Sequence, residues 1–225
     1  MQCYITRIAS YLPGPSIAND GIERFLGSLD GEAEVRDAVL KMNGIERRYY
    51  AQDERQKATH DVYQLGALAA ERCLTEMDEP ISYLGVGTTY APLAAPGCAS
   101  LIHDRLSESS HLNRPVEISS HAGICSSAST AMVAAVRAIN SGHHDSALCI
   151  GAEHASEVLK STVIQPVDDR TEHVNLRNSR WFMSVFLRFM LSDGAGALVL
   201  QNNPLRNGLS IGRTQCPLRM SRRCA

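Results

Sequence analysis

The sequence predicts an α/β fold in which helices cover a largely buried sheet. Helical and strand periodicities alternate along the middle of the chain, and the strands are short apolar runs that end in glycine or hydroxylated residues. Only 5% of the 225 residues are aromatic, and 16 are glycine. Apolar strands separated by amphipathic helices are typical of a sheet with both faces covered.

Two segments have the clearest helical spacing. Residues 59–74 and 126–141 place apolar side chains three and four positions apart, which predicts two amphipathic helices. Gly142 follows the second helix, where glycine commonly ends one. The other predicted elements are a strand at 81–89, a short helix at 99–106, and strands at 116–118, 147–150, 197–200 and 208–211.

Two segments depart from this alternation. Residues 160–188 are polar and contain the only tryptophan, Trp181, which predicts an irregular excursion over a surface or a pocket. Residues 208–225 lose all periodicity after the first few positions, and they are basic and contain two cysteines. We therefore expect a folded unit at 1–207 and an aberrant or truncated tail at 208–225.

The composition excludes several function classes. The chain has 22 basic and 24 acidic residues, a formal charge of −2, so we expect no nucleic-acid partner and no anionic membrane partner. No apolar run approaches the roughly 20 residues of a membrane span, and the N-terminus lacks the apolar core of a signal peptide. Seven scattered cysteines without a CxxC motif argue against a disulfide framework and against a metal site. These features predict a cytoplasmic protein.

Cys125 is the strongest candidate for a functional residue. It follows a strand and an Ala122–Gly123 turn, and it directly precedes the helix predicted at 126–141. The free N–H groups and the positive dipole end of a helix stabilise a thiolate and a developing oxyanion. The alternative is a buried cysteine that packs as a small apolar side chain, as we expect for Cys73 and Cys149.

His121 is a candidate assisting residue. It precedes Cys125 by four positions across the turn, a spacing that allows a Cys–His pair. The alternative is a loop histidine with an ordinary hydrogen bond. Gly194 and Gly196, which follow Asp193, indicate a turn there, which Asp193 is expected to shape.

Four segments, in order, resemble the thiolase-fold condensing enzymes, specifically the β-ketoacyl-ACP synthase III group. The segments are NGIERRYYA (43–51), GVGTTYAPLAAPGCA (85–99), AGICSSASTAMVAAVRAINSG with ALCIGAEHAS (122–142 and 147–156), and LSDGAGALVL (191–200). The resemblance implies a thiolase-like layered α/β/α fold, of which this chain has the first half-repeat and the start of the second. It makes residues 1–207 the thiolase-like N-terminal half.

The resemblance also implies an acyltransferase. In such enzymes a cysteine accepts an acyl group from a CoA or acyl carrier protein thioester, and a malonyl thioester then decarboxylates and condenses with it. Cys125 corresponds to that nucleophile, and Thr89, Ala95 and Pro96 are candidates for the acyl pocket. Ala95 stands where the family often has a larger side chain, which would admit a bulkier acyl group. No cofactor is implied, because acyl-CoA or acyl-ACP is the substrate.

The sequence also departs from the family at its cysteine motif, at the CoA-binding residues and in the second half. Cys125 begins Cys-Ser-Ser-Ala where members usually have Cys-x-Gly-Phe, and the residues that often grip the CoA nucleotide are not evident, which favours carrier-protein substrates. Motifs for the family's catalytic His and Asn, which lie in the second half, are not found, so we expect an incomplete chain. The expected partners are an acyl carrier protein or CoA thioesters, in a homodimer or a heterodimer with a related ketosynthase. Arg47 and Arg48 would meet a pantetheine phosphate or an acidic carrier protein, or else form a solvated loop pair.

Two alternatives to this acyltransferase remain open. One is a non-catalytic thiolase-like partner subunit that binds an acyl carrier protein or a ketosynthase. The other is a CoA-dependent relative, such as a hydroxymethylglutaryl-CoA synthase or an acyl-CoA hydrolase-like protein. Reactivity of the Cys125 thiol discriminates the non-catalytic alternative from both enzymes.

Overall fold

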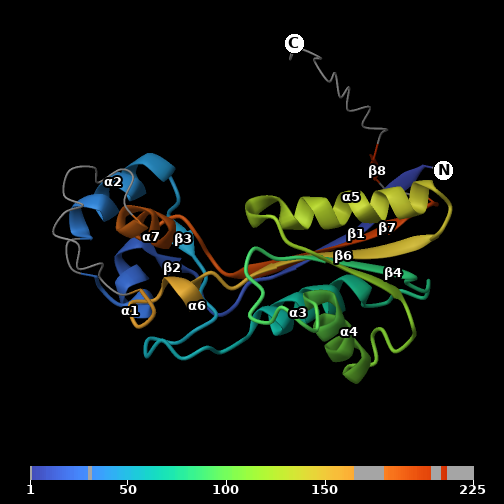
Figure 1. Ribbon diagram of the computed structural model, residues 1–225, viewed down its shortest axis with the longest axis horizontal. Helices are drawn as coiled ribbons and strands as arrows, with labels where there is room; N and C mark the ends of the chain where they lie inside the picture. Colours follow the sequence, from blue (N-terminus) through green and yellow to red (C-terminus); the bar gives the residue numbers. More distant parts are fainter. Residues whose placement is uncertain (1, 30–31, 165–179, 204–208, 212–225) are drawn as a thin grey trace, which may run out of the picture.

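The computed structural model describes residues 2–29, 32–164, 180–203 and 209–211. A six-stranded mixed sheet with helices on both faces forms the larger part of the structure (Figure 1). A cluster of short helices lies at one end of the sheet and consists of α1 (Ile22–Leu26), α2 (Ala33–Asn43), α6 (Ser156–Leu159) and α7 (Arg180–Arg188). The predicted α/β class is therefore confirmed.

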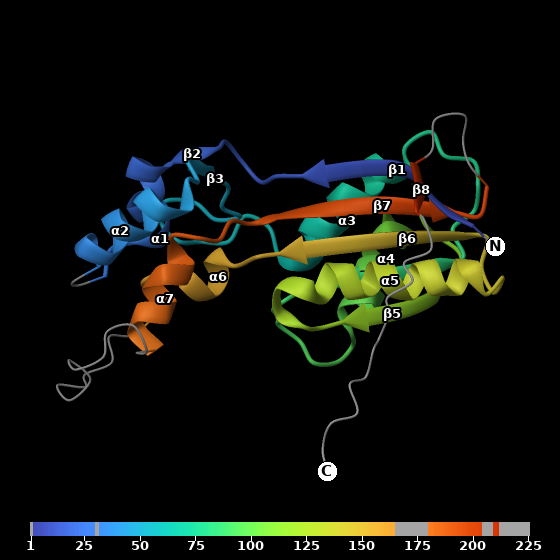
Figure 2. The same ribbon diagram turned by 90° about the horizontal axis from the view of Figure 1, so that it is seen from above.

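The sheet has the strand order β5-β4-β6-β7-β1-β8. β4 pairs in parallel with β5 and β6, whereas β7 is antiparallel to both β6 and β1. The carboxyl ends of the three parallel strands consequently lie at one edge, towards the short helices (Figure 2). The strands are β1 (Cys3–Tyr11), β4 (Tyr83–Gly87), β5 (Glu117–His121), β6 (Ser146–Glu153), β7 (Gly194–Gln201) and β8 (Leu209–Ile211), and β2 (Ile17–Ala18) pairs separately with β3 (Arg47–Arg48).

Three helices cover this sheet. α3 (Val62–Leu74) and α4 (Cys98–Glu108) pack on one face, and α5 (Ser127–Asn140) packs on the other (Figure 1). α3 begins where the sequence provides a capping box: the Asp61 carboxylate accepts from the Gln64 N–H, and the Gln64 side chain accepts from the Asp61 N–H. Gly142 follows α5 with a φ of 80°, the left-handed conformation expected of a residue that ends a helix.

The N-terminal elements were not predicted from the sequence. β1 lies between β7 and the edge strand β8, most of its residues are only half-buried, and it has no continuous apolar run. α1 (Ile22–Leu26) and α2 (Ala33–Asn43) are short, so neither presents a sustained apolar stripe. β1, α1 and α2 are stabilised by partners that lie far away in the sequence: β1 pairs with β7, and the two helices pack against α7 (Arg180–Arg188) and the residue after it.

The interpretation of residues 160–188 as an irregular excursion is wrong for the part that α7 occupies. Val185 and Phe189 are fully buried and pack against Ile22 and Leu26 of α1. The helix was not predicted because the arginines of this segment make its sequence polar. α6 (Ser156–Leu159) ends just before the segment, and residues 165–179, which include much of the predicted excursion, lie outside the described residues.

Of the predicted tail at 208–225, the structure describes only β8. This strand pairs with β1 and corresponds to the strand predicted at 208–211. The boundary between residues 207 and 208 therefore stays a prediction. In the described part of the chain, no helix is long and apolar enough to cross a membrane.

A buried arginine organises the cluster of short helices. The Arg188 side chain is fully buried and lies 3.2 Å from the Glu32 carboxylate, with Nε facing Oε2. Its guanidinium also donates to the backbone carbonyls of Leu26, Gly27 and Leu159. One cation thus neutralises a buried carboxylate and satisfies three carbonyls, two at the end of α1 and one at the end of α6.

The two arginines of β3 have different environments. Arg48 is fully buried and donates to the Asn19 side chain and to the Phe189 carbonyl. Neither expectation for Arg48, a solvated side chain or a phosphate contact, is therefore correct. Arg47 is exposed and donates to Ser16.

We predict that Arg188→Met destabilises the protein by about 3–5 kcal/mol, because it leaves the buried Glu32 carboxylate without a counter-charge. Arg24→Met is the matched control, since the Arg24–Glu54 pair is exposed and worth at most about 1 kcal/mol. Urea unfolding followed by circular dichroism measures both variants. Equal stability of the two variants would contradict the assigned role of the buried pair.

Candidate active site

Cys125 lies where the chain turns from β5 into α5. After β5 ends at His121, one turn of 3-10 helix (Ile124–Ser126) carries the cysteine, and α5 begins at Ser127. The Cys125 side chain is exposed, so the alternative of a buried packing cysteine is wrong for this residue. The predicted position at a helix N-terminus is confirmed.

Two glycines allow the start of α5 to lie directly on the sheet. A Cβ atom on Gly87, at the end of β4, would lie 2.3 Å from the carbonyl carbon and oxygen of Ser127. A Cβ atom on Gly151, in β6, would lie 2.6 Å from the Ala128 Cβ. Any larger residue at these two positions would push the helix away, so the glycines fix the positive end of α5 at the carboxyl edge of the parallel strands.

A carboxylate that the sequence analysis missed lies beside this turn. Glu153, at the end of β6, accepts from the Thr89 N–H and from the Thr89 hydroxyl, both at 2.8 Å. The Thr89 hydroxyl also lies 3.0 Å from the carbonyl oxygen of Ile124, the residue before Cys125. Desolvation raises the pKa of Glu153, and the two Thr89 hydrogen bonds offset part of this effect. The sequence feature that could have indicated this residue is the position of Glu153 directly after the apolar run of a buried strand.

His121 has a partner other than Cys125. Its Nε2 lies 2.8 Å from the Ser119 hydroxyl, which in turn contacts the Tyr83 hydroxyl. Desolvation lowers the pKa of His121, which favours the neutral ring at neutral pH. The described structure records no hydrogen bond between His121 and Cys125, so the assisting role stays a prediction.

The three acyl-pocket candidates occupy one loop between β4 and α4. Thr89, Ala95 and Pro96 are all exposed. A hydrogen bond ties Thr89 to the turn that carries Cys125, whereas the structure records no such tie for Ala95 or Pro96. The structure thus brings together Thr89 and the cysteine turn, and the lining of an acyl pocket by these residues stays a prediction.

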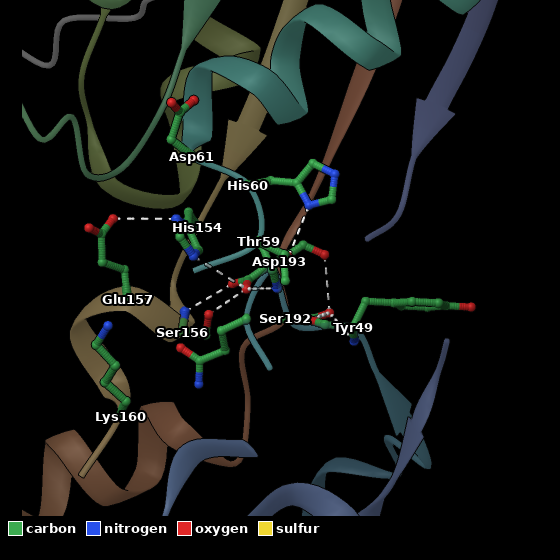
Figure 3. Close-up of polar contacts among 12 residues, drawn as sticks. Tyr49, Thr59, His60, Asp61, His154, Ser156, Glu157, Lys160, Ser192 and Asp193 are labelled. Atoms are coloured by element: carbon green, nitrogen blue, oxygen red, sulfur yellow. Dashed lines mark hydrogen bonds and ion pairs between the residues drawn. The ribbon is translucent and has the colours of Figure 1, made fainter. Parts of the chain in front are cut away.

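A second polar cluster lies at the same edge, between the sheet and the short helices (Figure 3). The buried Asp193 carboxylate accepts from the Ala51 N–H at 2.7 Å and from the N–H and hydroxyl of Ser156. Desolvation raises the pKa of Asp193, while the hydrogen bonds from Ser156 and Ala51 lower it. Asp193 therefore joins three segments, which is more than the turn-shaping role expected from the sequence.

The His154 side chain adjoins this cluster without a hydrogen bond. It is buried, and its two ring nitrogens lie 3.3 Å from the Glu157 carboxylate and 3.9 Å from the Asp193 carboxylate. Figure 3 shows the ring between the two acidic side chains. The described residues contain no group of His, Cys, Asp and Glu side chains that could hold a metal ion.

The other described cysteines differ sharply from Cys125. Cys3, Cys73, Cys98 and Cys149 are all buried. Desolvation raises the pKa of Cys149 to about 12 and the pKa of Cys3 and Cys98 to about 11, so these thiols stay protonated at neutral pH.

Comparison with known proteins agrees with this geometry. A family model described as "Beta-ketoacyl synthase, N-terminal domain" matches residues 118–204, which include the cysteine turn and β6. Among curated proteins, β-ketoacyl-[acyl-carrier-protein] synthase III of Ehrlichia ruminantium (strain Welgevonden) is 27% identical over 203 residues, 90% of this chain and 53% of the relative. The enzyme of the same name from Ehrlichia chaffeensis is 29% identical over 202 residues, 88% of this chain and 52% of the relative.

Solved structures of similar proteins share the fold. The 3-oxoacyl-(acyl carrier protein) synthase III of Pseudomonas aeruginosa PAO1 superposes with a TM-score of 0.65 at 19% identity, covering 94% of this chain and 55% of that one. The corresponding Aquifex aeolicus VF5 structure gives a TM-score of 0.62 at 20% identity, covering 89% and 54%. The chain spans about half the length of the curated relatives it matches, and the family model that matches it describes an N-terminal domain. The resemblance and the thiolase-like fold expected from the sequence are confirmed.

We predict that iodoacetamide alkylates Cys125 before any other described cysteine in the native protein at pH 8. Cys125 is exposed at a helix N-terminus, whereas Cys3, Cys98 and Cys149 are buried thiols whose pKa values are raised. Peptide mapping by mass spectrometry scores each thiol separately, and urea-unfolded protein is the control in which all of them react. Slower modification of Cys125 than of Cys149 would contradict this assignment of the site.

Proposed function

We propose that this chain carries the acyl-accepting part of a condensing acyltransferase of the β-ketoacyl-ACP synthase III type, with Cys125 as the nucleophile. The supporting observation is the exposed Cys125 thiol at the start of α5, on the carboxyl edge of three parallel strands. This cysteine lies within the segment that the ketoacyl synthase family model matches. Ligands of open α/β sheets commonly bind at this edge.

The proposed acylation step follows from the chemistry of a cysteine at a helix N-terminus. The Cys125 sulfur attacks the carbonyl carbon of an acyl thioester, and the carbonyl oxygen becomes an oxyanion. Backbone N–H groups at the start of a helix stabilise such a charge. Collapse of the intermediate breaks the bond to the carrier sulfur, which leaves as a thiol after it takes up a proton, and the acyl group remains on Cys125.

The subsequent condensation needs groups beyond this cysteine. Decarboxylation of a malonyl thioester builds an enolate, which a neutral or cationic donor must stabilise. By resemblance these donors are a His and an Asn of the second half, for which this sequence has no recognisable motif. We therefore assign acyl acceptance to this chain, and condensation to a site completed by that second half.

The donor in this proposal is an acyl carrier protein or CoA, which enters as a substrate, and no further cofactor takes part. β-Ketoacyl-[acyl-carrier-protein] synthase III is the name carried by both curated relatives described above. The five described cysteines are all free, which supports a reducing, cytoplasmic setting.

The proposal includes assembly with a second copy or with a related ketosynthase. β5 is an edge strand whose residues are mostly exposed, and within the described chain only β4 pairs with it. Ile118 of β5 is 41% exposed, and Tyr90 and Leu93 of the adjacent loop are 44% and 48% exposed. An open strand edge next to exposed apolar side chains supports a protein–protein interface there.

We predict that incubation with short and medium acyl thioesters of CoA and of an acyl carrier protein adds one acyl group to Cys125. Cys125→Ala should abolish the adduct completely, because no other described thiol combines exposure with a helix N-terminus. Intact-protein mass spectrometry, followed by peptide mapping and hydroxylamine release, measures the thioester.

The control for this experiment is wild-type protein alkylated beforehand at Cys125. An adduct that persists in Cys125→Ala would remove Cys125 from the mechanism. An unreactive Cys125 in a protein that nevertheless forms a stable complex with a carrier protein or a ketosynthase would favour the non-catalytic partner subunit instead.

A further inference from the structure

The backbone carbonyl of Ile124 is the most heavily bonded group next to Cys125. It accepts from the Ser127 N–H, from the Ser127 hydroxyl at 2.7 Å and from the Thr89 hydroxyl at 3.0 Å. Ile124 itself has a φ of +52° and is 71% exposed. A β-branched residue is strained in this conformation and keeps it only where the surroundings hold it in place.

The donors to this carbonyl come from two different places. Both Ser127 groups belong to the first turn of α5, so they move together with the helix. Thr89 belongs to the loop that follows β4, so its hydroxyl ties the strained turn to a separate segment of the chain. The hydrogen bond from Thr89 to the Ile124 carbonyl therefore connects the cysteine turn to the loop that follows β4, independently of α5.

Glu153 in turn holds Thr89. The carboxylate oxygen Oε1 accepts from both the N–H and the hydroxyl of Thr89, and it projects from the end of β6, a strand buried along most of its length. The hydroxyl has one proton and serves either Glu153 or Ile124 at a given moment, whereas the Thr89 N–H bond to Glu153 persists in both cases. Loss of the carboxylate therefore removes both bonds that hold Thr89, whereas loss of the hydroxyl breaks the link to the turn and leaves the Thr89 N–H bonded to Glu153.

We propose that Thr89 and Glu153 are positioning residues that act in series, so that the β6 carboxylate holds Thr89 and Thr89 holds the Ile124 carbonyl in the orientation that presents the Cys125 thiol. This inference rests on the proposed function of Cys125 as the acyl acceptor. It gives Thr89 a role different from the lining of an acyl pocket expected from the sequence. Neither residue touches the acyl group in this role.

The test uses four variants of the full chain. Thr89→Val removes the hydroxyl and keeps the shape, Thr89→Ser keeps the hydroxyl, Glu153→Ala removes the anchor, and the fourth variant combines Thr89→Val with Glu153→Ala. The readouts are the iodoacetamide rate at Cys125, amide hydrogen exchange of residues 122–128, acyl loading from a thioester, and the thermal midpoint.

We expect Thr89→Val and Glu153→Ala to slow Cys125 alkylation and acyl loading about three- to tenfold, the range of one hydrogen bond, and to speed amide exchange at 122–128 by a similar factor. Thr89→Ser should rescue all three rates, and the thermal midpoint of Thr89→Val should match that of Thr89→Ser because residue 89 is exposed. The double variant should be no worse than the worse single variant, because both changes break one chain of contacts.

The possible outcomes separate the two proposals. Rates in Thr89→Val equal to those in Thr89→Ser, or fully additive effects in the double variant, would overturn the positioning role. If the wild-type protein takes no acyl group but alkylation and exchange still respond as expected, the positioning of the thiol stands and the proposed function fails. Normal acyl loading in every variant would retain Cys125 as acceptor and reject the role of Thr89 and Glu153.

Discussion

The close approach of α5 to the sheet is the constraint on which the site depends. Because Gly87 and Gly151 have no side chains, the first residues of the helix lie against the ends of β4 and β6. Cys125, in the 3-10 turn that leads into the helix, is thereby fixed at the edge where the three parallel strands end. The thiol remains exposed there, while the four other described cysteines are enclosed within the structure.

Carboxylates accumulate at this same edge and serve as anchors for backbone. Glu153 holds the loop after β4, and Asp193 joins Ala51, Ser156 and the start of β7. A carboxylate that accepts several fixed hydrogen bonds connects segments that have no common secondary structure. In the cluster of short helices the positively charged Arg188 also connects separate segments, because its guanidinium binds three carbonyls and the Glu32 carboxylate. Polar contacts thus join the two parts of the molecule around the proposed site.

Much of the central fold was predictable from the sequence, because α3, α4, α5, β4, β6 and β7 are local patterns with strong periodicity or continuous apolar runs. The position of Cys125 was predictable for the same reason: a turn of small residues leads directly into a well-formed helix. β1 and α7 were not predictable, since each is only partly apolar and gains its identity from distant partners. Arg48 was misinterpreted because a charged side chain in sequence gives no indication of burial.

The sequence by itself determined the α/β class, the helix that starts after Cys125 and the resemblance to synthase III enzymes, because these depend on residues close together along the chain. Only the tertiary structure decided that Tyr83 of β4 contacts Ser119, the partner of His121, and that Glu153 reaches Thr89, 64 residues away. A side chain's partners depend on strand order and on how closely helix and sheet pack. Neither is encoded in any local pattern, since each arises from the combined packing of the whole fold.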